Sequence, residues 1–338
     1  MNSYNQKGPE FDIAVSSRVR LARNFNDIPF PIKMSQDQQN KLIERMQHIF
    51  SNVPNQKLAY LNMPSLHEIE KYSLVERHLI SPDLAETRNN SGAFINENQN
   101  ISIMINEEDH IRIQTLYNGI QLERAYEECN AIDGIIEKEA DYAFDIRYGY
   151  LTSCPTNLGT GIRASVMLHL PALVMTGYIK SVLENCSKIG VAVRGLYGEN
   201  SDALGDMFQV SNQITLGRKE EEIISSIDNI SKQIIDREKA LRHQLYKQDV
   251  YRFEDRIFRS YGILKNARII NSEECFKLIS DVRLGVSMGI INGVDIVDIN
   301  DIMVFSQPAT LQKIMGKQLS KDERDIKRAE LIRQKMLK

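Results

Sequence analysis

The stretch Cys154-Pro155-Thr156-Asn157-Leu158-Gly159-Thr160-Gly161-Ile162-Arg163 combines a thiol, a glycine-rich turn and an arginine in one short segment. Guanidinium groups are always charged, and their paired donors match the oxygens of a phosphate. If this stretch converges in the fold with three other arginine-bearing segments, the sequence predicts an arginine cage for a polyphosphate with carboxylates at its edge. Those segments are Ser16-Ser17-Arg18-Val19-Arg20, Asn106-Glu107-Glu108-Asp109-His110-Ile111-Arg112 and Arg194-Gly195-Leu196-Tyr197-Gly198-Glu199.

Two common nucleotide-handling designs are absent from the sequence. There is no Gly-x-x-x-x-Gly-Lys-Ser/Thr loop, and no His-Arg-Asp segment followed by Asp-Phe-Gly. Any phosphoryl transfer by this chain must therefore use a different scaffold.

From about residue 12 to about residue 240, the four segments resemble, in order, the nucleotide and guanidine motifs of the ATP:guanidino phosphotransferases, the arginine and creatine kinase family. The resemblance implies an α+β fold with a curved, mostly antiparallel sheet flanked by helices. It also implies transfer of the ATP γ-phosphoryl group to a guanidinium nitrogen, with Mg²⁺ bridging the phosphate oxygens. No dedicated metal cage is expected, because magnesium uses the phosphates of the nucleotide and keeps several waters.

The resemblance also implies roles for single residues. A guanidinium nitrogen is a poor nucleophile, so we expect Glu108 to orient it and take its proton, and Glu199 to clamp its other side. Cys154 is expected to precede a helix start and to lie among cations, so that it is a thiolate that pairs with the substrate guanidinium. The residues that the resemblance assigns to ATP are Ser16, Ser17, Arg18, Val19, Arg20, His78, Arg112, Arg163, Ala164, Ser165, Val166, Met167, Arg194, Gly195, Leu196, Tyr197, Gly198 and Glu199.

Both ends of the chain differ from the small-molecule guanidine kinases. Only about fifteen residues precede Ser16 where those enzymes have a helical domain, so we expect a guanidine pocket that is open on one side. Near the other end, Arg324-Asp325-Ile326-Lys327-Arg328-Ala329 resembles the phosphoarginine-binding motif of the bacterial protein-arginine kinases, the McsB group. Arg324 and Arg328 are one helical turn apart, as are Asp325 and Ala329, which predicts one adjoining patch.

These features predict two domains, a catalytic domain at 12–240 and a helical phosphoarginine-binding domain at 241–338. The resemblance implies that the substrates are protein arginines, including those of a stress-gene repressor, marked for the Clp unfoldase and protease. It further implies a zinc-binding activator protein, and a homodimer is possible. Two alternatives stay open: a small-guanidine kinase that makes a phosphagen, and a non-catalytic adaptor that binds phosphoarginine.

Composition agrees with a globular cytoplasmic enzyme. The chain has 338 residues, 42% of them hydrophobic, and a net charge of -3, which argues against a general nucleic-acid surface. The sequence contains no secretory leader and no apolar run of membrane-spanning length, so we expect a cytoplasmic protein with reduced thiols. No pair of histidines or cysteines has the spacing of a metal site.

Local patterns predict several elements. Ser35 with Gln38, and Ser320 with Glu323, form capping-box patterns ahead of helices. Two strands are expected, a half-buried one at 101–105 and a short one at 191–194 that is followed by a glycine-flanked loop. A helix is expected over 163–174, with its first turn facing the phosphates. A long amphipathic helix at 220–246 and a mainly helical region from 252 to 338 complete the expectations. His78, His110 and His169 are also expected to make structural hydrogen bonds.

Overall fold

The computed structural model describes residues 7–51, 57–195 and 203–336. Within these ranges, eight strands form one antiparallel sheet in the order β2-β3-β4-β5-β1-β8-β10-β9. Their bounds are β1 (Ala14–Arg23), β2 (Leu58–Asn62), β3 (Gly92–Asn96), β4 (Ile101–Ile105), β5 (Ile111–Asn118), β8 (Ile162–His169), β9 (Val191–Gly195) and β10 (Met207–Asn212). A separate hairpin joins β6 (Phe144–Asp145) to β7 (Gly149–Tyr150).

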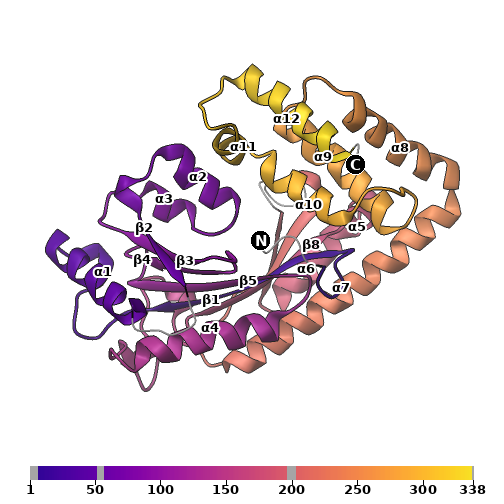
Figure 1. Ribbon diagram of the computed structural model, residues 1–338. Coiled ribbons are helices and arrows are strands. Elements are labelled where there is room, and N and C mark those ends of the chain that lie inside the picture. The colour runs from indigo at the N-terminus through magenta and orange to yellow at the C-terminus, as the bar shows by residue number, and fades with distance from the viewer. Residues whose placement is uncertain (1–6, 52–56, 196–202, 337–338) are drawn as a thin grey trace.

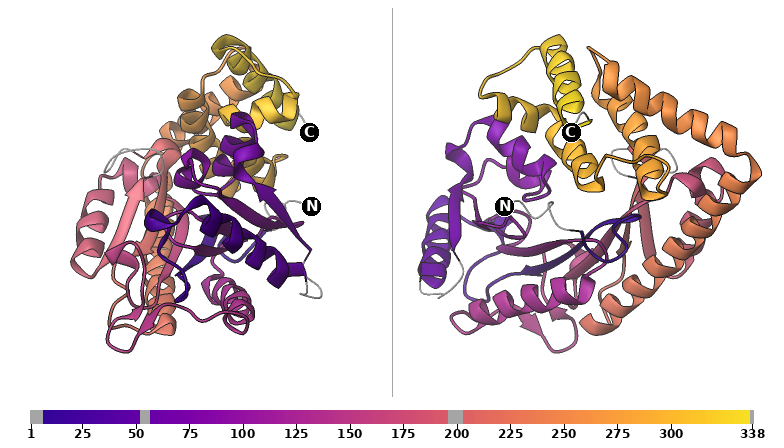
Figure 2. Two further views of the ribbon diagram at one scale, coloured as in Figure 1. Left: turned by 90° about the vertical axis from the view of Figure 1, so that its left-hand side faces the viewer. Right: turned by 45° about the vertical axis from the view of Figure 1, so that its right-hand side comes forward.

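Helices lie on both sides of the sheet, and the helices from residue 250 onward form a separate bundle (Figure 1, Figure 2). The part of the chain that forms the sheet was predicted to be catalytic, and we call it the catalytic half. It contains α1 (Gln36–Ser51), α2 (Glu68–Glu76), α3 (Pro82–Glu86), α4 (Leu122–Glu137), α5 (Pro171–Met175) and α6 (Ile179–Lys188). The long helix α7 (Glu220–Gln248) then leads to α8 (Val250–Asn266), α9 (Ser272–Ser287), α10 (Ile296–Phe305), α11 (Pro308–Met315) and α12 (Lys321–Met336). The expected α+β fold is thereby confirmed.

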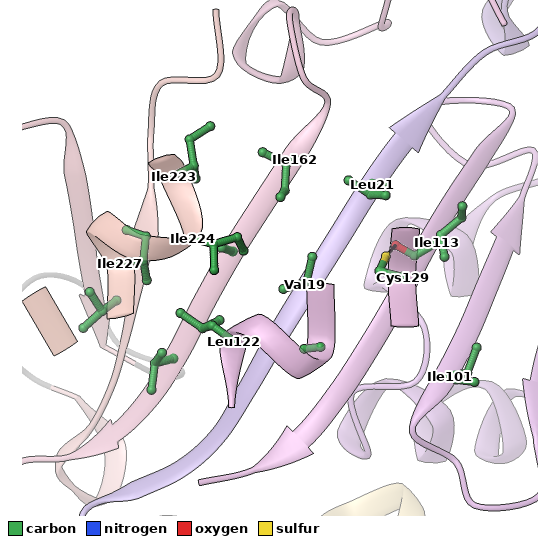
Figure 3. Close-up of a cluster of buried hydrophobic side chains, with 14 of the residues drawn as sticks. Val19, Leu21, Ile101, Ile113, Leu122, Cys129, Ile162, Ile223, Ile224 and Ile227 are labelled. Carbon is green, nitrogen blue, oxygen red and sulfur yellow. Dashed lines mark hydrogen bonds between the residues drawn. The ribbon is translucent and has the colours of Figure 1, made fainter. Parts of the chain in front are cut away.

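Apolar and polar side chains alternate along the central strands, and this alternation gives the sheet one apolar face. Val19 and Leu21 on β1 point to the same side as Ile113 on β5 and Ile162 on β8, and all four are fully buried. The amphipathic helices α4 and α7 cover this side, with Ile223 among the residues that pack against it (Figure 3). Burying each such side chain contributes roughly 1.5–3 kcal/mol, so this layer anchors the sheet.

Several local expectations are confirmed, because short-range chemistry decides them. Ser35 and Gln38 exchange the two hydrogen bonds of a capping box at the start of α1, and Ser320 with Glu323 does the same at α12. The long amphipathic helix is α7, the short strand at 191–194 is β9, and the region after residue 250 is helical.

The helix expected over 163–174 is wrong. This segment is strand β8, followed after His169 by the single-turn helix α5. Ile162, Ala164 and Val166 are buried on one face of β8, whereas Arg163 points to the other face, and this period of two belongs to a strand. The helix start that was expected to face the phosphates is therefore absent.

The strand expected at 101–105 is β4, but it is buried on both faces rather than half-buried. Ile103 faces the main core, and Ser102 and Met104 on the opposite face are each 1% exposed. Helices α2 and α3 cover this second face, where Leu74 and Leu84 pack in the same cluster as Met104.

The helical bundle has its own core and contacts the catalytic half through several hydrogen bonds, on two sides of the bundle. On one side, Glu76 of α2 accepts hydrogen bonds from the backbone N–H groups of Ala309 and Thr310 at the start of α11. On the other side, the buried Arg283 of α9 donates to the backbone carbonyls of Phe11 and Asp12, just before β1. The bundle therefore spans from α2 to the first residues of the sheet.

Candidate active site

Four of the five predicted arginines share the sheet face opposite α4 and α7. Arg20 on β1 lies directly opposite Gln114 on β5 and Arg163 on β8. Arg18 is two residues before Arg20, and Arg112 is two residues before Gln114. Because residues that oppose each other or alternate along a strand point to one side, these four guanidinium groups project from the same face.

The fifth arginine reaches the same face from the far edge of the sheet. Arg194 on β9 lies opposite Gln209 on β10, which lies opposite Met167 on β8. Met167 is four residues beyond Arg163, so it points to the same side. Arg194 is exposed, and the segment that follows Gly195 lies outside the described residues.

The electrostatics of this arginine face favour a bound anion. Burial, and then the charges of Arg18, Arg112 and Arg163, lower the pKa of Arg20 well below its usual value. Burial, Arg194 and Arg112 likewise lower the pKa of Arg163. The Nε atoms of Arg20 and Arg163 are buried and have no hydrogen-bond partner among the residues that the structure describes. Phosphate oxygens would satisfy both donors and offset the repulsion between the cations.

The acidic loop between β4 and β5 holds Arg112 in place. Its guanidinium donates from Nη1 to Glu107 at 2.7 Å and from Nη2 to Glu108 at 3.1 Å. The Glu107 side chain is only 1% exposed and also accepts a hydrogen bond from the Ser81 hydroxyl. Glu108 is more open, with a side chain that is 41% exposed. Burial raises the pKa of Glu108, an effect that Arg112 opposes and Asp109 reinforces.

A buried hydrogen-bond network brings Cys154 toward this acidic loop. Asp109 accepts hydrogen bonds from the side chain of Asn24 and from the backbone N–H of Ser153, both at 2.7 Å. Ser153 directly precedes Cys154, and Asp109 directly follows Glu108. The thiol and the carboxylate predicted to act on the acceptor thus come from two loops that are bonded to each other.

The surroundings of Cys154 match the expectation only in part. The side chain is half-buried, and its Sγ lies 3.0 Å from the hydroxyl of Thr156. The thiol is also close enough to Arg163 to interact with its charge. However, only a short 3-10 turn at Pro155–Asn157 follows it, so the helix start that was expected to stabilise a thiolate is absent.

His78 lies beside the arginine face, close to Arg18 and Gln114. It follows α2 with a φ of 58°, and its carbonyl accepts a hydrogen bond from the Gln114 side chain at 2.7 Å. Burial and the nearby Arg18 lower the pKa of His78 to about 4. The ring is therefore neutral at pH 7, which suits contact with an aromatic base rather than with phosphate.

His110 and His169 are held by structural hydrogen bonds, as expected. The His110 ring accepts a hydrogen bond from the backbone N–H of Phe25, and the His169 ring is 2.9 Å from the Ser280 hydroxyl.

The residues predicted for ATP divide between the two faces of the sheet. Ser16, Ser165 and Met167 share the arginine face by register, whereas Ser17 bonds to the carbonyl of Gly119 on the other side. Val19, Ala164 and Val166 are buried between the sheet and the helices α4 and α7, so they pack in the core and their side chains do not reach the arginine face. Gly195 ends β9, and the predicted residues Leu196, Tyr197, Gly198 and Glu199 lie outside the described ranges.

Sequence reasoning did not assign roles to Glu107, Asp109, Ser81 or Asn24, which hold the site together. The Asn106–His110 string contained a signal for the first two, because acidic residues in a loop between strands often face a cleft. Nothing local in the sequence indicates Ser81 or Asn24, since their partners are far away along the chain.

The predicted phosphoarginine motif lies in the first half of α12. Arg328 is buried and donates to the backbone carbonyls of Ile270 and Ser306, and also to the Asp325 carboxylate. Ala329 packs in the core of the helical bundle, while Asp325 remains partly exposed. Within the motif, the buried arginine therefore fixes both the helix and the orientation of Asp325.

The structure adds two general observations about the described residues. None of their helices has the length and apolar character needed to cross a membrane. They also contain no group of three or more histidine, cysteine, aspartate or glutamate side chains arranged to hold a metal ion.

Comparison with known proteins identifies the relatives of this chain. Residues 41–241 match the family model of the ATP:guanido phosphotransferase C-terminal catalytic domain, and residues 251–338 match that of the protein-arginine kinase McsB C-terminal domain. The chain is 47% identical to the protein-arginine kinase of Bacillus subtilis, over 98% of this chain and 92% of the relative. The protein-arginine kinase of Halothermothrix orenii is also 47% identical, over 98% of this chain and 95% of that relative.

Solved structures agree on the fold of the catalytic half. The duplicated taurocyamine kinase from Schistosoma mansoni, with bound transition-state analogue components, superimposes with a TM-score of 0.61 at 25% identity. That match covers 70% of this chain and 35% of the taurocyamine kinase. Lombricine kinase gives a TM-score of 0.61 at 23% identity, and the match covers 70% of this chain and 69% of lombricine kinase. With both family models matched in order and curated relatives aligned over nearly its full length, the chain belongs to the protein-arginine kinases, built on the ATP:guanido phosphotransferase fold.

Proposed function

We propose that this chain transfers the γ-phosphoryl group of ATP to arginine side chains of proteins. The observation that carries the proposal is the arginine face, where two buried Nε donors lack partners among the described residues and the Glu108 carboxylate is bonded to the neighbouring Arg112. A triphosphate supplies the missing acceptors, and a carboxylate at its end suits a guanidinium acceptor. The names of the curated relatives support proteins as the source of that acceptor.

ATP would lie across the sheet with its phosphates on the arginine face. Arg20 and Arg163 would bind phosphate oxygens through their unpartnered Nε donors, and Arg18, Arg112 and Arg194 would add charge at the flanks. Because Arg112 is already fixed by two carboxylates, it would stabilise charge on the phosphoryl group without reorganising. Mg²⁺ bound with the nucleotide would neutralise the remaining phosphate charge. His78 would contact the adenine.

The acceptor arginine would enter beside the acidic loop. Glu108 would orient the guanidinium and take the proton that its nitrogen loses, while the new N–P bond forms and the bond between the γ-phosphorus and the ADP oxygen breaks. A raised pKa makes Glu108 a better proton acceptor than an ordinary carboxylate. Cys154 and Glu199 would hold the other edges of the planar guanidinium.

The helical bundle would bind phosphoarginine at the start of α12. Asp325 would accept hydrogen bonds from the ligand guanidinium, and the half-buried Arg324 would bind its phosphate. Arg328, already bonded to Asp325, would position that carboxylate, whereas Ala329 packs in the bundle core and would support the helix rather than face the ligand. The match of 251–338 to the McsB C-terminal family model supports this assignment.

We also infer a division at about residue 240, with 12–240 catalytic and 241–338 binding phosphoarginine. Its support is the change of core near the end of α7, where Leu245 packs against both cores. Leu241 of α7 still belongs to the catalytic core, whereas Phe253 of α8 belongs to the core of the bundle. In the cytoplasm, the enzyme would mark a stress-gene repressor and damaged proteins for Clp-dependent proteolysis as part of a stress response. A zinc-binding activator protein, allosteric control and a homodimer complete the proposal.

The test is incubation with Mg²⁺ and ATP and either a loosely folded arginine-rich protein or free arginine, with the activator supplied. Mass spectrometry and an acid-lability assay then locate the phosphate. We expect acid-labile phosphate on protein arginines and none on the free amino acid. Phosphate on free arginine alone would favour a phosphagen kinase, and no transfer to either would favour a phosphoarginine-binding adaptor.

A further inference from the structure

The last residue of α2 caps a helix of the bundle. α11 begins with Pro308, which has no backbone N–H, so the first donors that need acceptors are those of Ala309 and Thr310. Among the described residues, the preceding Gln307 makes no capping hydrogen bond with its side chain. Glu76 accepts from both donors instead, one with each carboxylate oxygen, at 2.8 and 2.6 Å. The catalytic half therefore supplies the cap of α11, and the two helices lie side by side (Figure 1).

The contact between α2 and α11 is shielded from water. Nearly one turn before Glu76, the fully buried Ser73 has its hydroxyl 3.4 Å from that of Thr310, which is 3% exposed. Burial raises the pKa of Glu76, although the N–H donors of α11 and the charge of Arg328 oppose this shift. Without Glu76, the two N–H groups at the start of α11 would lose their acceptors, which is costly in a buried contact.

The chain that follows Glu76 is fixed on the sheet. Ser102 on β4 lies directly opposite Gln114 on β5. The Gln114 side chain donates to the carbonyl of His78 at 2.7 Å, and the Ser102 hydroxyl donates to the carbonyl of Leu79. Two neighbouring side chains of the sheet thus hold two consecutive carbonyls. They fix a backbone in which His78 has a φ of 58°, a conformation that residues other than glycine adopt at a cost.

Gln114 itself belongs to the arginine face. It lies directly opposite Arg20, two residues beyond Arg112, and is only 4% exposed. His78, the predicted contact of the adenine, is therefore bonded to the surface that would bind the phosphates. His78 is also only two residues after Glu76. One short stretch of backbone thus links the start of α11 to the candidate nucleotide site.

We propose that Glu76 is a positioning residue for the nucleotide, and that it acts by tying α11 to the backbone that places His78. A nucleotide in contact with His78 restrains the same backbone and so strengthens the cap on α11. Coupling between two equilibria is reciprocal, so the docking of α11 and the binding of ATP favour each other. The inference rests on the proposed function, because it requires that ATP lies against His78 and the arginine face.

The first measurement uses the wild-type protein and needs no substitution. Hydrogen exchange is followed by mass spectrometry with and without Mg²⁺ and a non-hydrolysable ATP analogue, whose binding is measured separately by calorimetry. We expect the analogue to slow exchange at Ala309 and Thr310 by at least about threefold. Helix α8, which is capped by the adjoining Asp249, serves as the reference and should not change.

The exchange result separates the inference from the proposed function. If the analogue binds but exchange at the start of α11 stays the same, the coupling is wrong while the proposed function stands. If the analogue does not bind, the proposed function fails and the inference fails with it. This measurement decides the matter even if a variant at Glu76 does not fold.

The second measurement changes the cap. Glu76→Gln keeps the length of the side chain but loses its charge and one acceptor oxygen. The control is Asp249→Ala, which removes the side chain that caps α8 by accepting the N–H of Arg252 at 3.1 Å. For each variant, Kd for the analogue is measured by calorimetry, and kcat and KM for ATP are measured with a loosely folded protein substrate.

We expect Glu76→Gln to raise Kd and KM for ATP about fivefold, to keep kcat at saturating ATP within about twofold, and to remove the effect of the analogue on exchange. Asp249→Ala should bind the analogue as wild type does. An unchanged Kd in Glu76→Gln, or an equal loss in Asp249→Ala, would overturn the proposal, since general destabilisation would then explain the data. A lower kcat with unchanged Kd would overturn it as well.

Discussion

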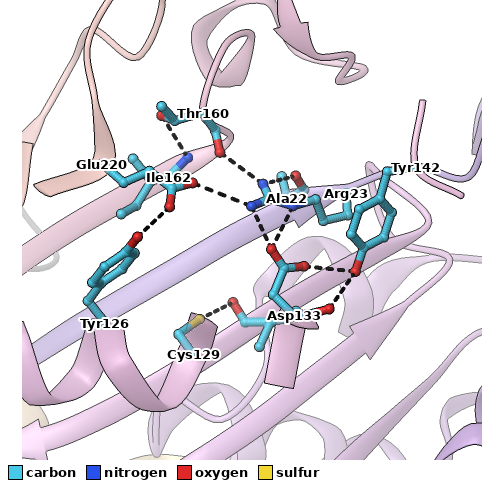
Figure 4. A network of polar contacts seen from close by, with 10 residues as sticks. Ala22, Arg23, Tyr126, Cys129, Asp133, Tyr142, Thr160, Ile162 and Glu220 are labelled. Atoms are coloured by element: carbon cyan, nitrogen blue, oxygen red, sulfur yellow. Dashed lines mark hydrogen bonds and ion pairs between the residues drawn. The ribbon is translucent and has the colours of Figure 1, made fainter. Parts of the chain in front are cut away.

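Asp133→Asn should destabilise the catalytic half strongly, because it removes one charge from a buried pair. Asp133 of α4 accepts two hydrogen bonds from Arg23, from Nε at 3.0 Å and from Nη2 at 2.7 Å (Figure 4). Its second oxygen accepts a hydrogen bond from the Tyr142 hydroxyl at 2.7 Å. The Arg23 and Asp133 side chains are only 1% and 6% exposed.

The magnitude follows from what Arg23 retains after the substitution. Removing one partner of a buried ion pair costs about 3–5 kcal/mol, because the other charge stays buried. Glu220 remains near Arg23, but at 3.4 Å it compensates only in part, which places the expected loss near about 3 kcal/mol. At roughly 2–4 °C per kcal/mol for a domain of this size, Tm should fall by roughly 6–12 °C.

Urea and thermal unfolding of purified protein measure this loss, and Asp27→Asn provides a matched control. Asp27 also pairs with an arginine, Arg45, but in a surface position where the Asp27 side chain is 61% exposed. Exposed pairs contribute about 1 kcal/mol or less. If Asp133→Asn is no more destabilising than Asp27→Asn, then the buried network does not stabilise this half as argued.

Three further predictions concern the sites. Glu108→Gln should lower turnover by about 10²–10⁴-fold while ATP affinity stays within a fewfold, measured by phosphate transfer and nucleotide titration; loss of ATP binding would mean that the base lies elsewhere. Folding lowers the pKa of His78 from 6.5 to about 4. Between these two pH values the unfolded chain therefore binds more protons than the folded chain. The free energy of unfolding must decrease as pH falls through this window. His78→Gln should reduce that slope in urea titrations from about pH 7 to about pH 4.5, and an unchanged slope would show that the ring is not buried in neutral form. Asp325→Ala should weaken phosphoarginine binding in calorimetry much more than it slows transfer to a good substrate, and an unchanged affinity would remove Asp325 from the proposed binding site.

Much of the candidate site could be predicted from sequence because its chemistry lies in short segments. An Asn-Glu-Glu-Asp-His string, or an arginine close to glycines, indicates the same chemistry whether or not its partners in the fold are known. Local rules also predicted α7 and both capping boxes, since hydrogen bonds and periodicity within a few residues decide them. By contrast, 163–174 combines a short apolar alternation with good helix formers, and only its neighbours β1 and β10 make it a strand.

The sequence alone determined which residue types this protein brings to the candidate active site: the five arginines, the acidic loop with Glu108, and the thiol of Cys154. Only the tertiary structure decided that strand register places the arginines on one face and leaves two of their donors without a hydrogen-bond partner in the described part of the chain. It also decided that Ser81 and Asn24 hold the acidic loop. The physical reason is that strand pairing and buried hydrogen bonds join residues far apart along the chain, and no local pattern records those partners.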